Sequence, residues 1–201
     1  MISMKHFILV AILASICNFD VIGQVPTKAE DICPLLIGED LPNGRLKDAY
    51  GNPVDLHDLI NEKASVVVFY RGGWCPYCNA HLSELATLED QIIKLGFQLI
   101  AISTEEPQNL LTTTDKNKTG FTLLSDPKGV FMQEVGIGFE ANEKTQAFMA
   151  KNVTGEFTTI LPVPTLLVVS AKAEILFEYI SPNYKQRITD DILMAVLKSI
   201  D

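Results

Sequence analysis

Hydrophobic positions along the chain form short continuous apolar runs separated by stretches with helical spacing. Residues 64–70 and 97–103 are almost entirely apolar, β-branched or aromatic, which predicts two buried strands. Between them, from 79 to 95, apolar residues recur every three or four positions until Gly96, which predicts an amphipathic helix. We therefore expect a strand–helix–strand unit with parallel strands.

The same reasoning assigns the rest of the chain. We predict an N-terminal hairpin within 33–58, a helix at 107–116, a strand at 121–125 followed by a helical piece, a hairpin of strands at 164–170 and 175–180, and a C-terminal helix with Thr189 as N-cap. Residues 137–160 have the least distinct pattern, and we predict an insertion there with a helix near 143–151. The expected fold class is α/β, with a central mixed sheet flanked by helices.

Composition narrows the class of protein. With 201 residues, 47% apolar and 20% charged, the chain is long and apolar enough for one globular domain. Its 16 basic and 25 acidic residues give a net charge of −9. A nucleic-acid partner is not expected, because such a partner requires a basic surface.

The N-terminus has the pattern of an export signal. Residues 7–17 are uncharged and apolar, too short a run to span a bilayer and typical of a signal peptide. Val21 and Gly23 suit the −3 and −1 positions of a cleavage site. We predict a signal peptide at 1–23 and a mature domain at 24–201, exported to a periplasm or secreted, with no stable membrane insertion after cleavage.

Cysteine usage indicates a reactive pair rather than a disulfide scaffold. A lipid anchor at Cys17 is disfavoured, because Ile16 is too large for the residue before a lipidated cysteine. The mature chain keeps an odd number of cysteines, Cys33, Cys75 and Cys78. Cys33 is open to three interpretations: a resolving thiol, an intermolecular partner, or an inert small apolar residue, which we favour.

The motif Trp74-Cys75-Pro76-Tyr77-Cys78 follows the strand at 64–70 and a glycine pair, where the helix should begin. Unpaired N–H groups and a partial positive charge at a helix start stabilise a thiolate. Such a thiolate can attack an S–S or O–O bond, and the second sulfur can then close a disulfide. The alternative, a metal site that includes His81, lacks a fourth ligand. We predict redox-active Cys75 and Cys78, with no metal and no cofactor.

Three residues near the cysteines each have a possible supporting role and an alternative role. Arg71 either favours the thiolate electrostatically or is a solvated loop arginine. Trp74 either shields the sulfur pair from water or simply packs. His81 could tune the thiols, but we predict an ordinary surface histidine.

The order strand, Cys-x-x-Cys, helix, strand, and then Val163-Pro164-Thr165 opening a hairpin resembles the thioredoxin fold. In that family the proline before the late strand is cis and packs against the cysteine pair. The resemblance therefore implies a supporting role and a cis peptide bond for Pro164. The alternative is an ordinary proline at the start of a strand.

A longer array resembles the peroxiredoxin-like branch of the alkyl hydroperoxide reductase and thiol-specific antioxidant family. It comprises 34–56, Phe69 to Cys78, Leu123 to Asp126, Pro182-Asn183-Tyr184, and Arg187. The resemblance implies a thiol peroxidase of cell redox homeostasis that reduces hydrogen peroxide or organic hydroperoxides. It also implies an external dithiol reductant of thioredoxin type.

The register of this resemblance leaves the order of attack open. Typical peroxiredoxins have threonine where this chain has Cys75, and their peroxidatic cysteine aligns with Cys78. In a disulfide-exchange mechanism Cys75 would instead attack from an exposed helix tip and Cys78 would resolve. Both schemes end in a Cys75–Cys78 disulfide. The alternatives in function are a thiol–disulfide oxidoreductase acting on protein disulfides and a non-enzymatic redox-sensing module.

Overall fold

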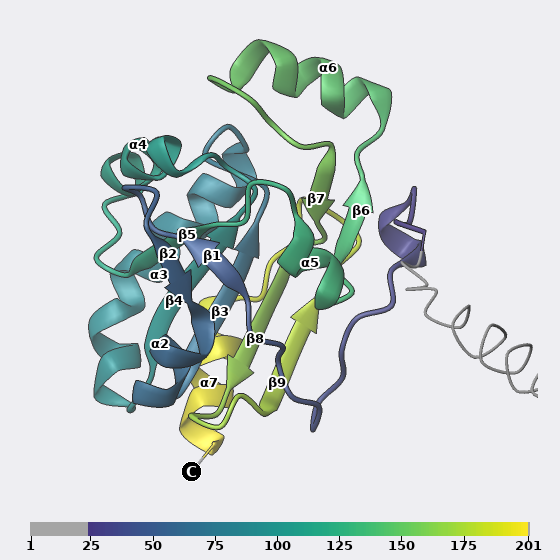
Figure 1. Ribbon diagram of the computed structural model, residues 1–201. Coiled ribbons are helices and arrows are strands. Elements are labelled where there is room, and N and C mark those ends of the chain that lie inside the picture. The colour runs from purple at the N-terminus through teal and green to yellow at the C-terminus, as the bar shows by residue number, and fades with distance from the viewer. Residues whose placement is uncertain (1–23, 201) are drawn as a thin grey trace, which may run out of the picture.

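A seven-stranded mixed sheet forms the centre of the protein (Figure 1). The computed structural model describes residues 24–200, so the predicted signal peptide lies outside the described residues. The strands are β1 (Arg45–Lys47), β2 (Pro53–Asp55), β3 (Ser65–Tyr70), β4 (Gln98–Ser103), β5 (Thr122–Ser125), β8 (Thr165–Val169) and β9 (Ile175–Ile180). Their order is β2-β1-β5-β4-β3-β8-β9. Strands β3 and β4 are parallel and the hairpins at both edges are antiparallel, as predicted, and β5 also runs parallel to β4.

Strand β3 lies between two hydrophobic layers. All six of its residues are buried. Because side chains alternate along a strand, Val66, Val68 and Tyr70 join one apolar cluster, while Val67 and Phe69 join the other. A strand covered on both faces reads as a continuous apolar run, which is why the sequence pattern identified it.

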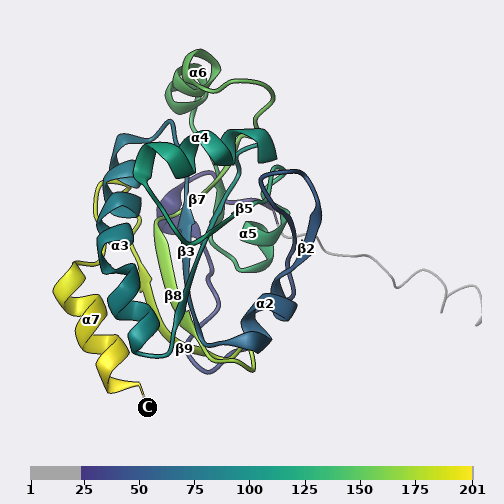
Figure 2. The same ribbon diagram turned by 90° about the vertical axis from the view of Figure 1, so that its left-hand side faces the viewer.

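Helices cover both faces of the sheet (Figure 2). One face carries α3 (Pro76–Lys94), α4 (Pro107–Asn117) and α7 (Asp190–Ser199), and the other carries α2 (Leu56–Glu62) and α5 (Val130–Glu134). Thr189 is the N-cap of α7 as predicted, although its side chain makes no capping hydrogen bond. The predicted mixed sheet flanked by helices is confirmed.

The predicted insertion at 137–160 extends to residue 162 and forms a separate two-stranded sheet with one helix. It contains β6 (Gly138–Glu140), the predicted helix as α6 (Glu143–Asn152), and β7 (Ile160–Pro162), with β6 and β7 paired antiparallel. A small buried cluster of Ala141, Met149 and Leu161 anchors it. In Figure 1, α6 stands beyond one end of the main sheet, apart from the other helices.

Two further short elements were not predicted. They are η1 (Ala29–Asp31) and α2, whose first turn is capped by the Asp55 side chain accepting from the backbone N–H groups of His57 and Asp58. Elements this short leave little periodicity to detect. Among the described residues, no helix has the length and apolarity needed to cross a membrane.

The expected cis peptide bond before Pro164 is wrong. All peptide bonds within residues 24–200 are trans. The chain runs from β7 through Val163 and Pro164 directly into β8 in sheet-like pairing, with the Pro164 carbonyl accepting from the Ser181 N–H at 3.0 Å. The trans form is the intrinsically preferred one for such a link. Pro164 is a buried proline directly before β8, and its supporting role beside the cysteines stays a prediction.

Candidate active site

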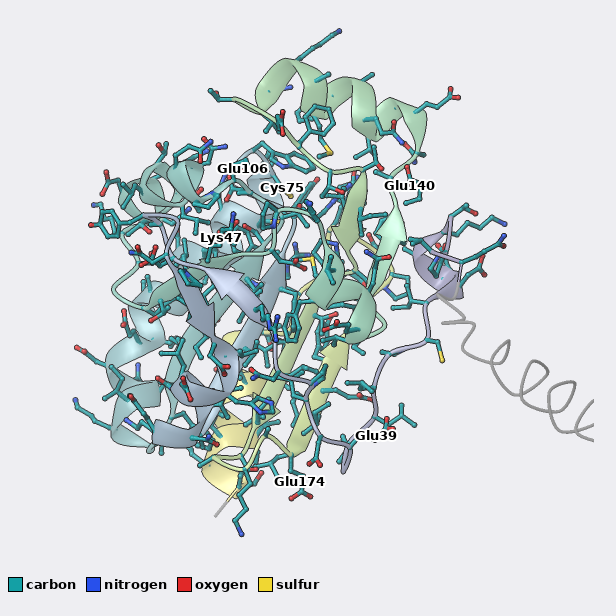
Figure 3. The ribbon with its side chains drawn as sticks, viewed as in Figure 1. Glu39, Lys47, Cys75, Glu106, Glu140 and Glu174 are labelled. Carbon is teal, nitrogen blue, oxygen red and sulfur yellow. The ribbon has the colours of Figure 1, made fainter. Side chains whose placement is uncertain are left out.

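The two cysteines lie where the loop after β3 enters α3. Cys75 is the N-cap of α3, Pro76 is its first residue, and Cys78 follows within the first turn. Proline suits the first helical position because the N–H that it lacks would have no helical partner there. Figure 3 shows Cys75 at the end of the main sheet that faces α6. The predicted cysteine pair at a helix N-terminus is present.

Polar contacts fix the loop that leads to Cys75. The Gly73 carbonyl accepts hydrogen bonds from Asn79 Nδ2 at 2.7 Å and from Lys116 Nζ at 3.2 Å. Asn117 Nδ2 in turn donates to Asn79 Oδ1 at 3.2 Å. The first turn of α3 and the end of α4 therefore hold the loop together.

A buried carboxylate lies behind the same loop. Glu105 accepts hydrogen bonds from Tyr70 Oη at 3.2 Å and from Thr113 Oγ1 at 3.1 Å. Burial raises the pKa of Glu105, and the backbone N–H of Gly73 and these hydroxyl donors oppose that rise. Sequence reasoning did not single out this residue, because a lone glutamate after a strand carries no spacing signal.

The two sulfurs have opposite electrostatic environments. A hydrogen bond from the Cys78 side chain is the largest influence that lowers the pKa of Cys75 to about 6, with help from the Cys78 backbone and from Arg71 and Arg187. Burial is the largest influence on Cys78, and it raises the pKa of that thiol well above its usual value. At neutral pH the thiolate therefore resides on Cys75, with Cys78 as its hydrogen-bond donor.

Cys75 is reached through a cavity of about 570 Å³. The expected exposed helix tip is wrong, since Cys75 is only 2% exposed. It nevertheless lines the cavity, and Cys78 does not. The other walls come from η1, the loop before α3 and the first turn of that helix, β6, α6, and the segment after β9. The lining includes one arginine and five aromatic residues: Arg71, Trp74, Tyr77, Phe139, Phe148 and Tyr184.

Arg71 is a buried part of this cavity wall, so the solvated-loop alternative is wrong. Its side chain is 7% exposed, and the guanidinium carbon lies 5.2 Å from the Trp74 ring centroid and 5.3 Å from that of Tyr184. Burial lowers the pKa of Arg71, and the charges of Cys75 and Cys78 are the largest influences that raise it. Trp74 also faces Phe148 of α6 at 6.0 Å between ring centroids. Both supporting residues lie beside Cys75, whereas Pro164 is not among the lining residues.

Arg187 is an additional residue of the site. Its Nη2 donates a hydrogen bond to Cys78 Sγ at 3.3 Å, although the two residues are far apart in sequence. The sequence signal that could have identified Arg187 as a site residue was its place among the residues that resemble the peroxiredoxin-like branch. Tyr184, from the same short segment, forms a T-shaped pair with Tyr77 at 5.6 Å.

The prediction that His81 is a surface residue is wrong. His81 is 5% exposed rather than on the surface, and burial lowers the pKa of its imidazole to about 3. The ring is therefore neutral at physiological pH. Cys33 is exposed and makes no disulfide within the described residues, and its role stays a prediction. No group of three or more metal-ligating side chains occurs within residues 24–200.

The hydrogen bond between the sulfurs predicts a change in the titration of Cys75. In a Cys33→Ser background, we expect Cys78→Ala to move the midpoint of Cys75 alkylation by iodoacetamide from about pH 6 toward the ordinary thiol value of about 8.5. Cys78→Ser keeps a donor and should move it less. The midpoint is compared, and not the alkylation rate at one pH, because a thiolate of higher pKa is more nucleophilic. That greater nucleophilicity offsets the smaller thiolate fraction at any single pH. Equal midpoints in both variants would contradict the assignment.

A cysteine pair at the N-terminus of the helix that follows a central parallel strand defines a thiol oxidoreductase with a thioredoxin-like fold. Comparison with known proteins specifies the class further. Residues 37–177 match the AhpC/TSA family. The chain belongs to this family, and it is a thiol peroxidase of the peroxiredoxin type.

Individual relatives agree with this assignment. The chain is 28% identical over 165 residues to "Peroxiredoxin Bcp" of Escherichia coli (strain K12), which covers 82% of this chain and 97% of the relative. Among solved structures, Peroxidoxin BcpB from Mycobacterium tuberculosis has a TM-score of 0.63 at 18% identity, covering 82% of this chain and 97% of the other. Reduced Prx3 in complex with H2O2 from Vibrio vulnificus has a TM-score of 0.68 at 15% identity, covering 81% and 99%. These structures share the fold.

Proposed function

We propose that this protein reduces hydroperoxides with Cys75 as the attacking sulfur and Cys78 as the resolving one. The observation that carries the proposal is the division between the two sulfurs. Cys75 lines the cavity and has a pKa lowered to about 6, while Cys78 lies outside the cavity lining and has a raised pKa. This order departs from the family register, in which Cys78 would take the peroxidatic place.

The reaction follows from that division. The Cys75 thiolate attacks the terminal oxygen of the hydroperoxide and the O–O bond breaks. The departing alkoxide, or hydroxide in the case of hydrogen peroxide, takes up a proton to become an alcohol or water. Cys75 is left as a sulfenic acid. The Cys78 thiol then attacks this sulfur, and water leaves as the disulfide forms. An external dithiol of thioredoxin type restores both thiols and becomes a disulfide itself.

The neighbouring cations support both steps. Arg71 stabilises negative charge at Cys75, and Arg187 donates directly to Cys78 Sγ. In the second step Cys78 attacks the sulfenic acid on Cys75, and the Arg187 cation beside Cys78 Sγ favours the thiolate form of Cys78 that this attack needs.

Stoichiometric oxidation tests the proposal. One equivalent of hydroperoxide should remove two thiols from the reduced protein and lower its mass by two hydrogens, since a disulfide forms within the chain. Cys33→Ser should behave the same, because Cys33 is exposed and does not line the cavity. Stopped-flow fluorescence of Trp74 gives the rate. A second-order rate constant no larger than that of a free thiolate would reject the proposal.

Disulfide exchange is a second candidate, and one observation favours it. A cavity-lining Cys75 with a low pKa, backed by a buried Cys78, is also the arrangement that attacks a substrate disulfide. Reduction of insulin disulfides by the reduced protein tests this activity. Slow turnover with both peroxides and disulfides would favour the redox-sensing module.

We further propose that the chain is exported, on the pattern of residues 1–23 alone. N-terminal sequencing of the protein recovered from its host tests this. Cleavage before Gln24 supports export, and an intact Met1 end contradicts it.

A further inference from the structure

The cavity over Cys75 is far larger than hydrogen peroxide needs. Its volume of about 570 Å³ is within the range of pockets that hold organic ligands, roughly 300–1,000 Å³. A water molecule occupies about 30 Å³ in the liquid, and hydrogen peroxide is only one oxygen larger. Most of the cavity would therefore face solvent when hydrogen peroxide reacts.

Aromatic rings form much of the apolar part of the cavity lining, which also includes polar and charged side chains. Five rings line the cavity: Trp74, Tyr77, Phe139, Phe148 and Tyr184. They are arranged partly in pairs, with Trp74 facing Phe148 at 6.0 Å and Tyr77 meeting Tyr184 edge-on at 5.6 Å. Such walls recognise an apolar or aromatic body rather than a polar one.

A buried polar group marks the oxygen end. The Arg71 side chain is only 7% exposed, and its guanidinium group lies over the rings of Trp74 and Tyr184. It lines the cavity beside Cys75. Its Nε is buried without a hydrogen-bond partner among the described residues. Buried donors are normally paired, so a cationic group left incompletely satisfied at a cavity wall indicates a ligand that carries oxygen.

We infer that the preferred substrate is an organic hydroperoxide with a bulky apolar or aromatic body. Its O–O group lies between Arg71 and Cys75, and its body lies against the aromatic walls. This inference rests on the proposed function for its chemistry, and it adds the class of substrate. The wall residue Phe148, which α6 supplies, is a specificity-determining residue.

Rate comparisons test the preference. The reduced protein is oxidised in stopped flow by hydrogen peroxide, tert-butyl hydroperoxide and cumene hydroperoxide, and each rate constant is divided by that of a free thiolate with the same peroxide. This removes intrinsic differences in reactivity. Burial of a phenyl group predicts a corrected preference for cumene hydroperoxide over hydrogen peroxide on the order of 10- to 100-fold.

Two variants identify the wall. Phe148→Ala should lower the corrected preference several-fold, because one face of the apolar site is lost. Phe148 is 47% exposed, so its removal leaves the core intact. The matched control is Tyr50→Ala, another exposed ring, which is 79% exposed and outside the cavity lining. It should leave the preference unchanged. An unchanged preference in Phe148→Ala would overturn the role of α6.

A binding measurement separates this inference from the proposed function. Trp74 is the only tryptophan of the chain and lies in the cavity wall, so its fluorescence reports occupancy. We expect cumyl alcohol, the unreactive product of cumene hydroperoxide, to change the fluorescence of Cys75→Ser saturably. If Cys75→Ser binds cumyl alcohol but no peroxide oxidises the reduced parent protein rapidly, the proposed function is rejected and the binding site is kept. Rapid oxidation with no binding and no corrected preference would keep the function and overturn the site.

Discussion

Cys75→Ser is expected to lower the rate of oxidation by hydroperoxide by several orders of magnitude, because the atom that forms the bond to oxygen is removed. Cys78→Ser should keep the first step within about tenfold of the parent protein, since the attacking sulfur remains. The product of Cys78→Ser should be a sulfenic acid on Cys75 that dimedone traps and mass spectrometry locates. Both variants are made in the Cys33→Ser background in the chain that starts at Gln24, so that only one thiol remains.

The reverse result would restore the family register. If Cys75→Ser reacted rapidly and dimedone labelled Cys78, the buried sulfur would be the peroxidatic one. The raised pKa of Cys78 and its absence from the cavity lining argue against that outcome. Excess peroxide provides a second readout, because an unresolved sulfenic acid proceeds to the sulfinic acid.

Gly72→Ala is expected to destabilise the protein by about 3 kcal/mol, through backbone strain and overpacking together. Gly72 has φ +132°, a conformation that residues with a Cβ rarely adopt. An added Cβ would lie 2.6 Å from Trp74 Nε1 and 3.0 Å from Glu105 Cγ. Urea unfolding of the reduced protein measures the loss.

Gly51→Ala is the matched control for this substitution. Gly51 also has positive φ, +85°, but nothing lies within 4 Å of the added Cβ. It should lose only about 1 kcal/mol, the cost of strain alone. Equal losses in the two variants would mean that the contact of the loop with Trp74 and Glu105 contributes nothing to stability. A changed emission spectrum of Trp74 in Gly72→Ala alone would support the contact.

The centre of the main sheet could be predicted because its strands β3, β4 and β8 are buried on both faces. A run such as Ser65–Tyr70 carries its own signal, independent of where its neighbours lie. The three-residue strands β6 and β7 carry none, because their pairing depends on a contact between segments that α6 separates. The same is true of Arg187, whose contact with Cys78 is made only by the folded chain.

The error on His81 had an available signal. Cys78, His81, Leu82 and Leu85 follow helical spacing, and all four are buried on one face of α3. Residue type outweighed position in the prediction, since histidine is more often at the surface. The isomer of the Val163–Pro164 bond had no comparable signal, because family analogy and the intrinsic preference for trans point in opposite directions.

The two tasks of the cavity fall to different parts of the chain. The sulfurs and their cations lie on the loop after β3, on the first turn of α3 and on the segment before α7, whereas two of the five wall rings, Phe139 and Phe148, lie on β6 and α6. The excursion between β6 and β7 is held by its own small cluster around Met149. Replacing α6 with a helix of different side chains would therefore change the substrate preference, while the cysteines and arginines that carry out the reaction stayed in place. Substrate preference can therefore be varied separately from the reacting groups, and α6 is the helix at which laboratory evolution of that preference should start.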